Sequence, residues 1–387
     1  MSFRRSTVPG EDIRLAMEIT QRRREQIDRA SAGLPKYDYG VNRLSRALHP
    51  GTISAVIENK KACGTDTYRI TLRSKRSDGR FPCFRAGQFV TLSKQVNGSF
   101  LSRPYSISSS PNDALRGIIE LIVQRQGIFS TYLIEKAESG EEITVGEPSG
   151  DFYHDDIRDR GHVLAVAGGS GITPFLSMMK ALKEGSEEFR LTLLYGVKNR
   201  AQMVFDPQEY EDERICIIPV LSEEQAEGYH HGFISAEILE GYLNDHTSVF
   251  MCGPDAMYAY VTEQLVSLGF DPSRIRREHN SIKERTVAER KTVQLRVHIR
   301  DELFCIEAAN NETIVTALER AGIASPVRCR SGACGFCHSR VISGQYTVAA
   351  EHDFRRAADK KFNYIHACAA YPDSDLEIDV PFCEKEE

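Results

Sequence analysis

Residues 329–337 read Cys-Arg-Ser-Gly-Ala-Cys-Gly-Phe-Cys, and a further cysteine follows at position 368. This C-x4-C-x2-C…C spacing is that of a plant-type [2Fe–2S] centre, in which four thiolates hold two irons. Several loop residues are small, Ser331 to Ala333 and Gly335, so the loop has room to wrap and its N–H groups can point at sulfur. The expected metal ligands are Cys329, Cys334, Cys337 and Cys368.

Zinc and Rieske-type centres fit this pattern less well. Zinc ribbons usually pair two C-x-x-C knuckles about 15 to 20 residues apart, whereas this stretch has one C-x-x-C. A Rieske centre replaces two cysteines by histidines. His338 and His366 adjoin cysteines of the motif, but every cysteine is present, so we interpret both histidines as neighbours of the ligands. The chain is therefore expected to carry electrons.

Length and composition indicate a soluble multidomain protein. At about 150 residues per domain, 387 residues predict two or three domains. With 41% hydrophobic residues, 27% charged residues and a net charge of -6, nothing favours nucleic acid as a partner. No apolar run approaches the roughly 20 residues of a membrane span, and no apolar signal core follows Met1 to Arg5. A cytoplasmic location is expected.

The chain has ten cysteines and no export signal, which favours reduced thiols over a disulfide framework. Five of them lie outside the cluster motif and away from the motif at position 252. These five are expected to be small buried hydrophobes: Cys63, Cys83, Cys216, Cys305 and Cys383.

Hydrophobic periodicity separates an N-terminal extension from a first domain. Residues 1–50 form a basic helical extension, with one amphipathic helix over residues 11–30 before the stop signals Gly33 and Pro35. Its arginines could dock an acidic partner, but a solvated face packed on its own protein is favoured. Residues 51–155 alternate apolar and polar side chains in short runs, which predicts an antiparallel β-barrel.

The remaining pattern predicts two further domains and a linker. Residues 160–279 alternate buried strands with helices, as in a doubly wound α/β domain with a parallel sheet. Residues 280–291 are charged, lack an apolar face and read as a linker. Residues 292–387 begin with a strand hairpin and a short helix that Gly322 ends, and the cluster loop follows, which indicates an α+β ferredoxin domain.

Two motifs in the barrel segment fit a flavin. In Arg103-Pro104-Tyr105-Ser106 the arginine offers a cation to a phosphate, and the tyrosine on the same face offers a ring to the isoalloxazine. About twenty residues later, Gly127, Ser130 and Thr131 open an apparent helix whose N–H groups and hydroxyls suit a diphosphate. A plain helix cap is the alternative for this second motif, and the order of the two motifs favours the flavin.

Two motifs in the parallel-sheet segment fit a nicotinamide dinucleotide. Gly168, Gly169, Gly171 and Thr173 stand between the first parallel strand and its helix, where a pyrophosphate meets the helix N-terminus. The tripeptide Cys252-Gly253-Pro254 ends a later strand, at the sheet edge where ligands gather. The alternatives are a plain strand-to-helix turn for the first motif and a turn with an idle thiol for the second.

Four motifs in this order resemble the ferredoxin–NADP reductase superfamily: Arg103-Pro104-Tyr105-Ser106, the loop at residues 168–174, Cys252-Gly253-Pro254 and the C-terminal four-cysteine module. More narrowly, residues 51–383 are similar to the oxygenase-type reductases, such as the phenylacetyl-CoA epoxidase and phthalate dioxygenase reductases, that carry a plant-type ferredoxin of β-grasp fold at the C-terminus. The resemblance implies that the 103–106 and 127–131 motifs hold the flavin and that the 168–173 and 252–254 motifs hold the nucleotide. It places the residues involved in hydride transfer at Tyr105, Ser106, Cys252 and Glu278. Asn280 departs from this pattern, because the family has an aromatic residue there.

The expected function is that of a reductase. NAD(P)H gives a hydride to the flavin, and single electrons pass through the [2Fe–2S] cluster to a protein acceptor such as an oxygenase or another redox component. A redox-sensing or regulatory subunit with the same cofactors is the alternative, and the reverse direction is a third possibility. FAD is favoured over FMN. The choice between NADH and NADPH stays open, because Lys198 and Arg200 suit a 2′-phosphate but are equally suited to a solvated surface.

Overall fold

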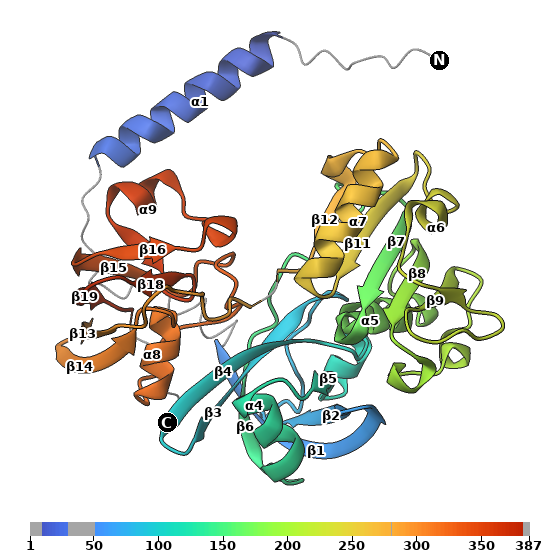
Figure 1. The fold of residues 1–387 in the computed structure, drawn as a ribbon, viewed down its shortest axis with the longest axis horizontal. Coiled ribbons are helices and arrows are strands. Elements are labelled where there is room, and N and C mark those ends of the chain that lie inside the picture. Colours follow the sequence, from blue (N-terminus) through green and yellow to red (C-terminus); the bar gives the residue numbers. More distant parts are fainter. Residues whose placement is uncertain (1–9, 30–50, 280, 382–387) are drawn as a thin grey trace.

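The computed structural model describes residues 10–29, 51–279 and 281–381, which form three bodies and one separate helix (Figure 1). The helix α1 (Gly10–Arg29) lies where the sequence predicts it. In the described part of the molecule it contacts the ferredoxin domain through Lys361, whose Nζ bonds Ile27 O at 3.0 Å and Asp28 Oδ1 at 3.2 Å. The stop signals Gly33 and Pro35 and the cysteine Cys383 lie outside the described residues.

The first body is an antiparallel six-stranded sheet in the order β4-β3-β6-β1-β2-β5. Alternation builds its core: in β2, Ile70 and Leu72 are fully buried while the residues between them reach the surface. A bridge between Ile107 and Leu121 ties the two edge strands together, as expected of the predicted barrel. The strands are β1 Thr52–Gly64, β2 Thr67–Ser74, β3 Phe89–Val96, β4 Ser99–Ser106, β5 Ile118–Gln124 and β6 Glu142–Gly146.

Short helices connect the barrel strands. They are α3 Pro111–Leu115, α4 Ile128–Thr131 and the π-helical turn η1 Tyr132–Lys136. The hairpin between β3 and β4 turns at Asn97 and Gly98, which have φ angles of 51° and 83°. An Asn-Gly pair with both φ angles positive is the preferred two-residue hairpin turn, because its twist matches that of the strands.

The second body is a parallel six-stranded sheet in the order β10-β9-β8-β7-β11-β12. Its central strands β7 and β11 are buried along almost their whole length and are apolar at residues 163–167 and 249–251, because helices cover both faces. The strands are β7 His162–Gly168, β8 Arg190–Val197, β9 Ile215–Leu221, β10 His230–His231, β11 Thr247–Cys252 and β12 Ile275–Arg277. The helices are α5 Thr173–Lys183, α6 Ala236–Glu240 and α7 Asp255–Ser267, with 3-10 turns η2 Gly169–Ile172, η3 Arg200–Gln202, η4 Pro207–Tyr210 and η5 Pro272–Arg274.

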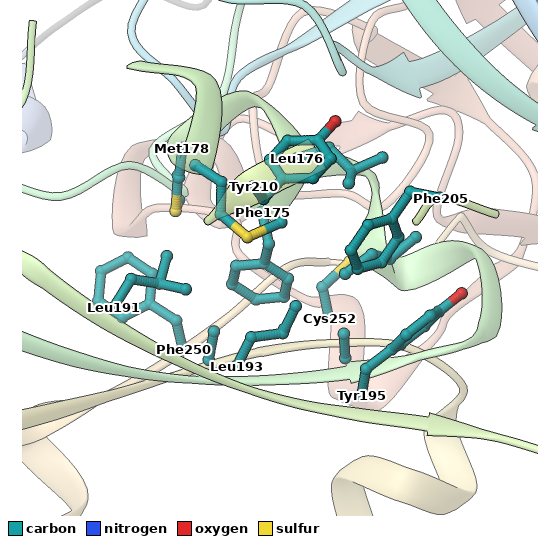
Figure 2. Packing of buried hydrophobic residues seen from close by; sticks show 14 of the residues in the cluster. Phe175, Leu176, Met178, Leu191, Leu193, Tyr195, Phe205, Tyr210, Phe250 and Cys252 are labelled. Atoms are coloured by element: carbon teal, nitrogen blue, oxygen red, sulfur yellow. The ribbon is translucent and has the colours of Figure 1, made fainter. Parts of the chain in front are cut away.

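Helix α5 supplies much of the core on one face of this sheet. Figure 2 shows Phe175, Leu176 and Met178 of the helix against Leu191, Leu193 and Tyr195 of β8. These helix residues are fully buried, as their helical spacing predicts. Cys252, at the end of β11, belongs to the same cluster, so the core continues to the sheet edge where the nucleotide motifs lie.

The third body is a five-stranded mixed sheet in the order β14-β13-β19-β15-β17, with α8 packed on it. The predicted hairpin and helix are present. The strands are β13 Thr292–Ile299, β14 Glu302–Ala309, β15 His338–Ser343, β17 Tyr364–His366 and β19 Leu376–Asp379, with β16 Tyr346–Val348 and β18 Ala370–Pro372 as a second small sheet. The helices are α8 Ile314–Arg320 and α9 Ala357–Lys361, with the 3-10 turn η6 Ala350–His352.

The segment predicted as a linker lies along the ferredoxin domain. Its Ile282 N–H donates to Arg330 O at 2.8 Å, and its Lys283 O accepts from the Tyr371 hydroxyl at 2.7 Å. The Arg285 guanidinium lies 4.8 Å from the centre of the Tyr371 ring. These contacts tie the chain to the domain on the C-terminal side of the segment.

The expectation of burial was wrong for three cysteines. Cys83, Cys216 and Cys305 are exposed, and Cys63 is half-buried. Cys216 and Cys305 do lie in β9 and β14, but at positions that face solvent, because alternate residues of a strand point to opposite sides. Among helices in the described ranges, none has the length and apolar character needed to cross a membrane.

Candidate redox site

One cavity of about 940 Å³ is lined by all three bodies. It receives Tyr105 and Ser106 from the barrel, Cys252 and Glu278 from the parallel-sheet domain, and Cys329 from the cluster loop. Four of these residues are the expected participants in hydride transfer, and the fifth is an expected iron ligand. The tertiary structure therefore brings the flavin, nucleotide and cluster motifs to one place.

The Arg-Pro-Tyr-Ser motif lies on β4, and its members point to different neighbours. Pro104, Tyr105 and Ser106 line the cavity. Burial raises the pKa of the Tyr105 hydroxyl above its usual range, so this side chain stays neutral. Arg103 is absent from the lining, because its Nη1 atom bonds Glu319 of the ferredoxin domain, at 3.1 Å to Oε1 and 2.9 Å to Oε2. The sequence gives no sign of this partner.

The motif at residues 127–131 forms only a short helix. The Ser130 hydroxyl accepts the N–H groups of Gln126 at 2.9 Å and Gly127 at 3.0 Å, as a capping residue does. Of the described residues here, Gln126 lines the cavity, whereas Gly127, Ser130 and Thr131 do not. The observed hydrogen bonds match the helix-cap alternative, and a diphosphate contact by these residues stays a prediction.

The glycine-rich loop needs glycine for close packing. A Cβ at Gly171 would lie 2.1 Å from Cys252 O, and a Cβ at Gly253 would lie 2.5 Å from Met257 Cε. The two loops that follow β7 and β11 are thereby in backbone contact. Gly168, Gly169, Gly171, Thr173, Gly253 and Pro254 line the cavity, as the sequence predicts.

Glu278 is the most perturbed acid of the cavity. It follows β12, its N–H donates to Met251 O at 3.1 Å, and its Oε2 atom is buried without a hydrogen-bond partner. Burial raises the pKa of this carboxyl to about 8, and the nearby Asp151 and Cys329 charges add to the rise. Glu278 therefore holds a proton near neutral pH. Burial also raises the pKa of the Cys252 thiol, which stays protonated.

The four expected iron ligands converge at the cluster loop. Cys329, Cys337 and Cys368 are buried, and Cys334 is exposed. The Cys329 Sγ accepts the N–H groups of Ser331 and Cys334, each at 3.4 Å. The thiols of Cys334 and Cys368 also donate to Cys329, and these hydrogen bonds lower the pKa of the Cys329 thiol.

The thiol arrangement fits a two-iron centre. The thiols contact one another in the order Cys334, Cys329, Cys368 and Cys337. Backbone N–H groups point at three of the sulfurs, since Phe336 N donates to Cys334 Sγ and Cys368 N to Cys337 Sγ, each at 3.5 Å. Such N–H···S bonds stabilise thiolate ligands. Within the described ranges, no three His, Cys, Asp or Glu side chains surround a single metal position, and the four thiols instead form a chain of contacts.

Two carboxylates that pair with Lys198 and Arg200 were not identified from the sequence. Lys198, which lines the cavity, pairs with Glu223 at 2.8 Å, and Arg200 pairs with Glu224 at 2.6 Å. Both glutamates follow β9, the strand next to β8. From the sequence, only Lys198 and Arg200, which follow β8, were considered as groups that could contact the ribose end of the nucleotide. The signal that would have found them is the acidic pair directly after the neighbouring parallel strand.

Comparison with known proteins agrees with this architecture. Family models match an oxidoreductase FAD-binding domain at residues 54–154, an oxidoreductase NAD-binding domain at residues 165–263 and a 2Fe-2S iron-sulfur cluster binding domain at residues 297–373. A component of the 1,2-phenylacetyl-CoA epoxidase of Escherichia coli is 30% identical over 320 residues, which cover 76% of this chain and 88% of the relative. The chain belongs to the ferredoxin–NADP reductase superfamily.

Two further proteins are similar to this reductase over most of its length. The glycine betaine monooxygenase reductase subunit of Chromohalobacter salexigens is 27% identical over 323 residues, covering 76% of this chain and 87% of the relative. The structure of phthalate dioxygenase reductase matches with a TM-score of 0.63 and 23% identity, covering 86% of this chain and 98% of that one. That structure shows the likeness of fold.

The family and the domains establish the type of activity. The reductase is an oxidoreductase that passes electrons from NAD(P)H through FAD and a [2Fe–2S] cluster to a redox partner. The oxygenase-type resemblance and the three-domain fold inferred from the sequence are confirmed. The regulatory alternative gains no support from these relatives, which are named as a monooxygenase reductase, a dioxygenase reductase and an epoxidase component.

Proposed function

We propose that this reductase supplies electrons to an oxygenase, with NADH as the electron donor. The shared cavity supports internal electron transfer, because flavin, nucleotide and cluster motifs within one cavity suit transfer over short distances. The names of the relatives support an oxygenase as the acceptor, since one is the reductase subunit of a glycine betaine monooxygenase and another is a phthalate dioxygenase reductase. The choice of NADH rests on the ion pairs of Lys198 and Arg200.

Residue roles follow from the cavity lining. Tyr105 and Ser106 would contact the FAD ring, and the loop at Gly168 to Thr173 would receive the nucleotide pyrophosphate. Cys252 and Glu278 would face the nicotinamide. FAD would accept two electrons from the nicotinamide as a hydride, and the cluster would accept them from FAD one at a time. The four cysteines would hold the cluster.

The protein side chains around the cavity would orient the cofactors and hold a proton close to them. Glu278 is half-buried, its Oε2 atom is fully buried, and its raised pKa keeps it protonated near neutral pH, so it can donate a hydrogen bond or a proton to a basic atom in the cavity. The Tyr258 hydroxyl links the loop at Gly253 to Glu278. It accepts a hydrogen bond from Gly253 N at 3.1 Å and donates one to Glu278 O at 2.9 Å. The neutral Cys252 thiol adds no charge beside the nicotinamide.

NADH is favoured because Lys198 and Arg200, the two cations that suit a 2′-phosphate, each have a carboxylate partner. Glu223 and Glu224 neutralise Lys198 and Arg200 and would repel a 2′-phosphate. A carboxylate is also the group that binds a free ribose 2′-hydroxyl in dinucleotide sites. We expect kcat/KM to be at least about tenfold higher for NADH than for NADPH, a difference of about 1.4 kcal/mol in transition-state binding.

The double variant Glu223→Gln and Glu224→Gln tests this preference. Freeing Lys198 and Arg200 should narrow the NADH to NADPH ratio about tenfold, chiefly by improving NADPH. Glu227→Gln, at an exposed position in the same loop, is the matched control and should leave the ratio unchanged. A double variant with the wild-type ratio would contradict the assignment of these carboxylates.

Sustained turnover separates the reductase from a sensor. Purified protein is titrated anaerobically with NADH and then NADPH, followed by visible absorption, and the flavin is released by acid and identified. Repeated reduction of a one-electron acceptor supports the reductase, and bleaching without turnover supports the sensor. NADH-dependent product formation by a purified oxygenase that lacks its own reductase tests the proposed partner.

The cytoplasm is the proposed location. NADH is generated there, and reduced thiols persist there. Fractionation of the source cells with an antibody against the ferredoxin domain tests this location.

A further inference from the structure

A buried carboxylate joins the ferredoxin domain to the flavin barrel. Glu319 lies on α8, and its side chain is only 3% exposed. Its Oε1 atom accepts from the Ser102 N–H at 3.0 Å and from Arg103 Nη1 at 3.1 Å, both on β4 of the barrel. The same oxygen accepts from Arg330 Nη1 of the cluster loop at 2.7 Å. One carboxylate therefore contacts the flavin motif and the cluster loop together.

The residues on both sides of the ligand Cys329 are bonded to the barrel. Arg330 Nη1 also lies 3.4 Å from Ser102 O. On the other side, Arg328 O accepts from the Thr91 hydroxyl at 3.0 Å, and the Arg328 guanidinium bonds the Ser149 hydroxyl at 3.3 Å. Cys329 is thus held against the barrel at two adjacent positions, and it lines the shared cavity.

The charges make Glu319 the central member of this contact. Arg330 is 6% exposed and needs a nearby negative charge, because a buried unpaired guanidinium is strongly unfavourable. Arg103 is 31% exposed, and among the described residues its bonds use only the Nη1 atom. Its other nitrogens stay available for a phosphate. Without Glu319, two arginines would face each other across the domain boundary.

A second buried glutamate next to α8 serves as an internal comparison. Glu312 is 7% exposed and bonds Arg320 Nη2 at 2.6 Å and the Ala309 N–H at 2.8 Å. These partners belong to the ferredoxin domain. Glu312 and Glu319 are therefore similar in burial and in pairing with arginine, but only Glu319 contacts the barrel.

We propose that Glu319 is a positioning residue for internal electron transfer: it docks the cluster loop on the barrel by bonding Arg103 and Arg330 at once. The proposal rests on the reductase function and concerns the step between flavin and cluster. Hydride transfer from NADH to the flavin does not depend on it.

The test compares Glu319→Gln and Glu319→Ala with Glu312→Gln in the cofactor-loaded protein. Anaerobic stopped-flow mixing with NADH follows flavin bleaching and cluster bleaching separately. Small-angle X-ray scattering measures the radius of gyration independently of turnover. For the Glu319 variants we expect flavin bleaching within about twofold of wild type, cluster bleaching slowed at least about tenfold, and a larger radius of gyration. Glu312→Gln should match wild type in all three measurements.

Two results would overturn the proposal. One is cluster bleaching at the wild-type rate with an unchanged radius of gyration in both Glu319 variants. The other is an equal slowing in Glu312→Gln, which would reveal a general effect of ferredoxin stability. If the Glu319→Ala protein does not retain its cluster, Glu319→Asp replaces it in the test, with the same expected results. Aspartate keeps the negative charge, but its shorter side chain moves the carboxylate away from Arg103 and Arg330. Loss of flavin bleaching in every variant would instead contradict the proposed function.

Discussion

Gly171 has no room for a side chain. Its ideal Cβ would lie 2.1 Å from Cys252 O and 2.8 Å from Gly253 Cα, so Gly171→Ala must push the two nucleotide loops apart. We expect the KM for NADH to rise at least about tenfold, while the cluster spectrum stays unchanged. Gly161→Ala is the control, because a Cβ there has nothing within 4 Å. Equal kinetics in the two variants would show that the close loop contact does not shape the nucleotide site.

The Glu278 carboxyl predicts a pH dependence of stability. Its pKa is about 8 in the folded protein, against an ordinary value of 4.5. Between these values the unfolded chain is ionised and the folded chain holds the proton, so unfolding releases a proton. The stabilising contribution is fully present below pH 4.5 and is lost as the pH rises through about 8, at up to about 1.4 kcal/mol per pH unit.

Glu278→Gln removes this dependence. Between pH 5 and pH 8.5 we expect the melting temperature of the wild type to fall relative to that of the variant, measured by thermal unfolding of the cofactor-loaded protein. The exposed Glu263→Gln should follow the wild-type curve. Parallel curves for wild type and Glu278→Gln would show that Glu278 does not hold its proton in this range.

At the scale of elements, the end of helix α8 packs against the tip of the β3–β4 hairpin. A Cβ at Gly322 would lie 2.6 Å from Gly98 O, and Gly322 has a φ of +74°. Gly185, which follows helix α5, has a similar φ of +71° but nothing within 4 Å of its Cβ position. The two glycines therefore share the left-handed backbone, and only one of them lies at a domain contact.

This pair separates backbone strain from domain docking. Alanine at either position should lower the free energy of unfolding by about 1 kcal/mol, because the left-handed conformation is unfavourable for alanine. Only Gly322→Ala should also slow electron transfer from flavin to cluster, because it displaces the hairpin that leads into the Arg103 motif. Stopped-flow bleaching of the cluster measures the rate of electron transfer from flavin to cluster. Equal rates in both variants would show that the contact between Gly322 and Gly98 has no role in docking.

At the scale of the whole molecule, the ferredoxin domain has an apolar core of its own, so a defect in its cluster loop should leave the other two bodies folded. Cys334→Ser removes the exposed member of the four expected iron ligands. We expect loss of the cluster spectrum and at least a tenfold loss of reduction of a one-electron protein acceptor, with NADH-driven flavin bleaching within about twofold of wild type. Cys305→Ser, exposed on β14, should behave as wild type. Loss of flavin bleaching in Cys334→Ser would mean that the bodies are not independent.

Local sequence patterns predicted most helices and strands. They also predicted three motifs whose residues line the cavity, at 103–106, 168–173 and 252–254. Alternation in β2 and apolar runs such as β7 produce their strands because a single period decides which face is buried. The four cluster ligands stay a prediction, based on the need of a two-iron centre for four thiolates and on a cysteine spacing that is rare by chance. The exposure of Cys216 and Cys305 could not be predicted, because an apolar run does not show which face of the strand meets solvent.

By itself, the sequence of this reductase determined its domain order, its cofactor classes and part of the cavity lining, such as Tyr105, Gly171 and Cys252, because each of these follows from a short local motif. Only the tertiary structure decided that Glu319 bonds Arg103, 216 positions away, and that Glu223 neutralises Lys198. Periodicity carries no information on the partner of a charged side chain in another element. That partner is decided by how the domains pack, because a buried charge needs an opposite charge within a few ångströms.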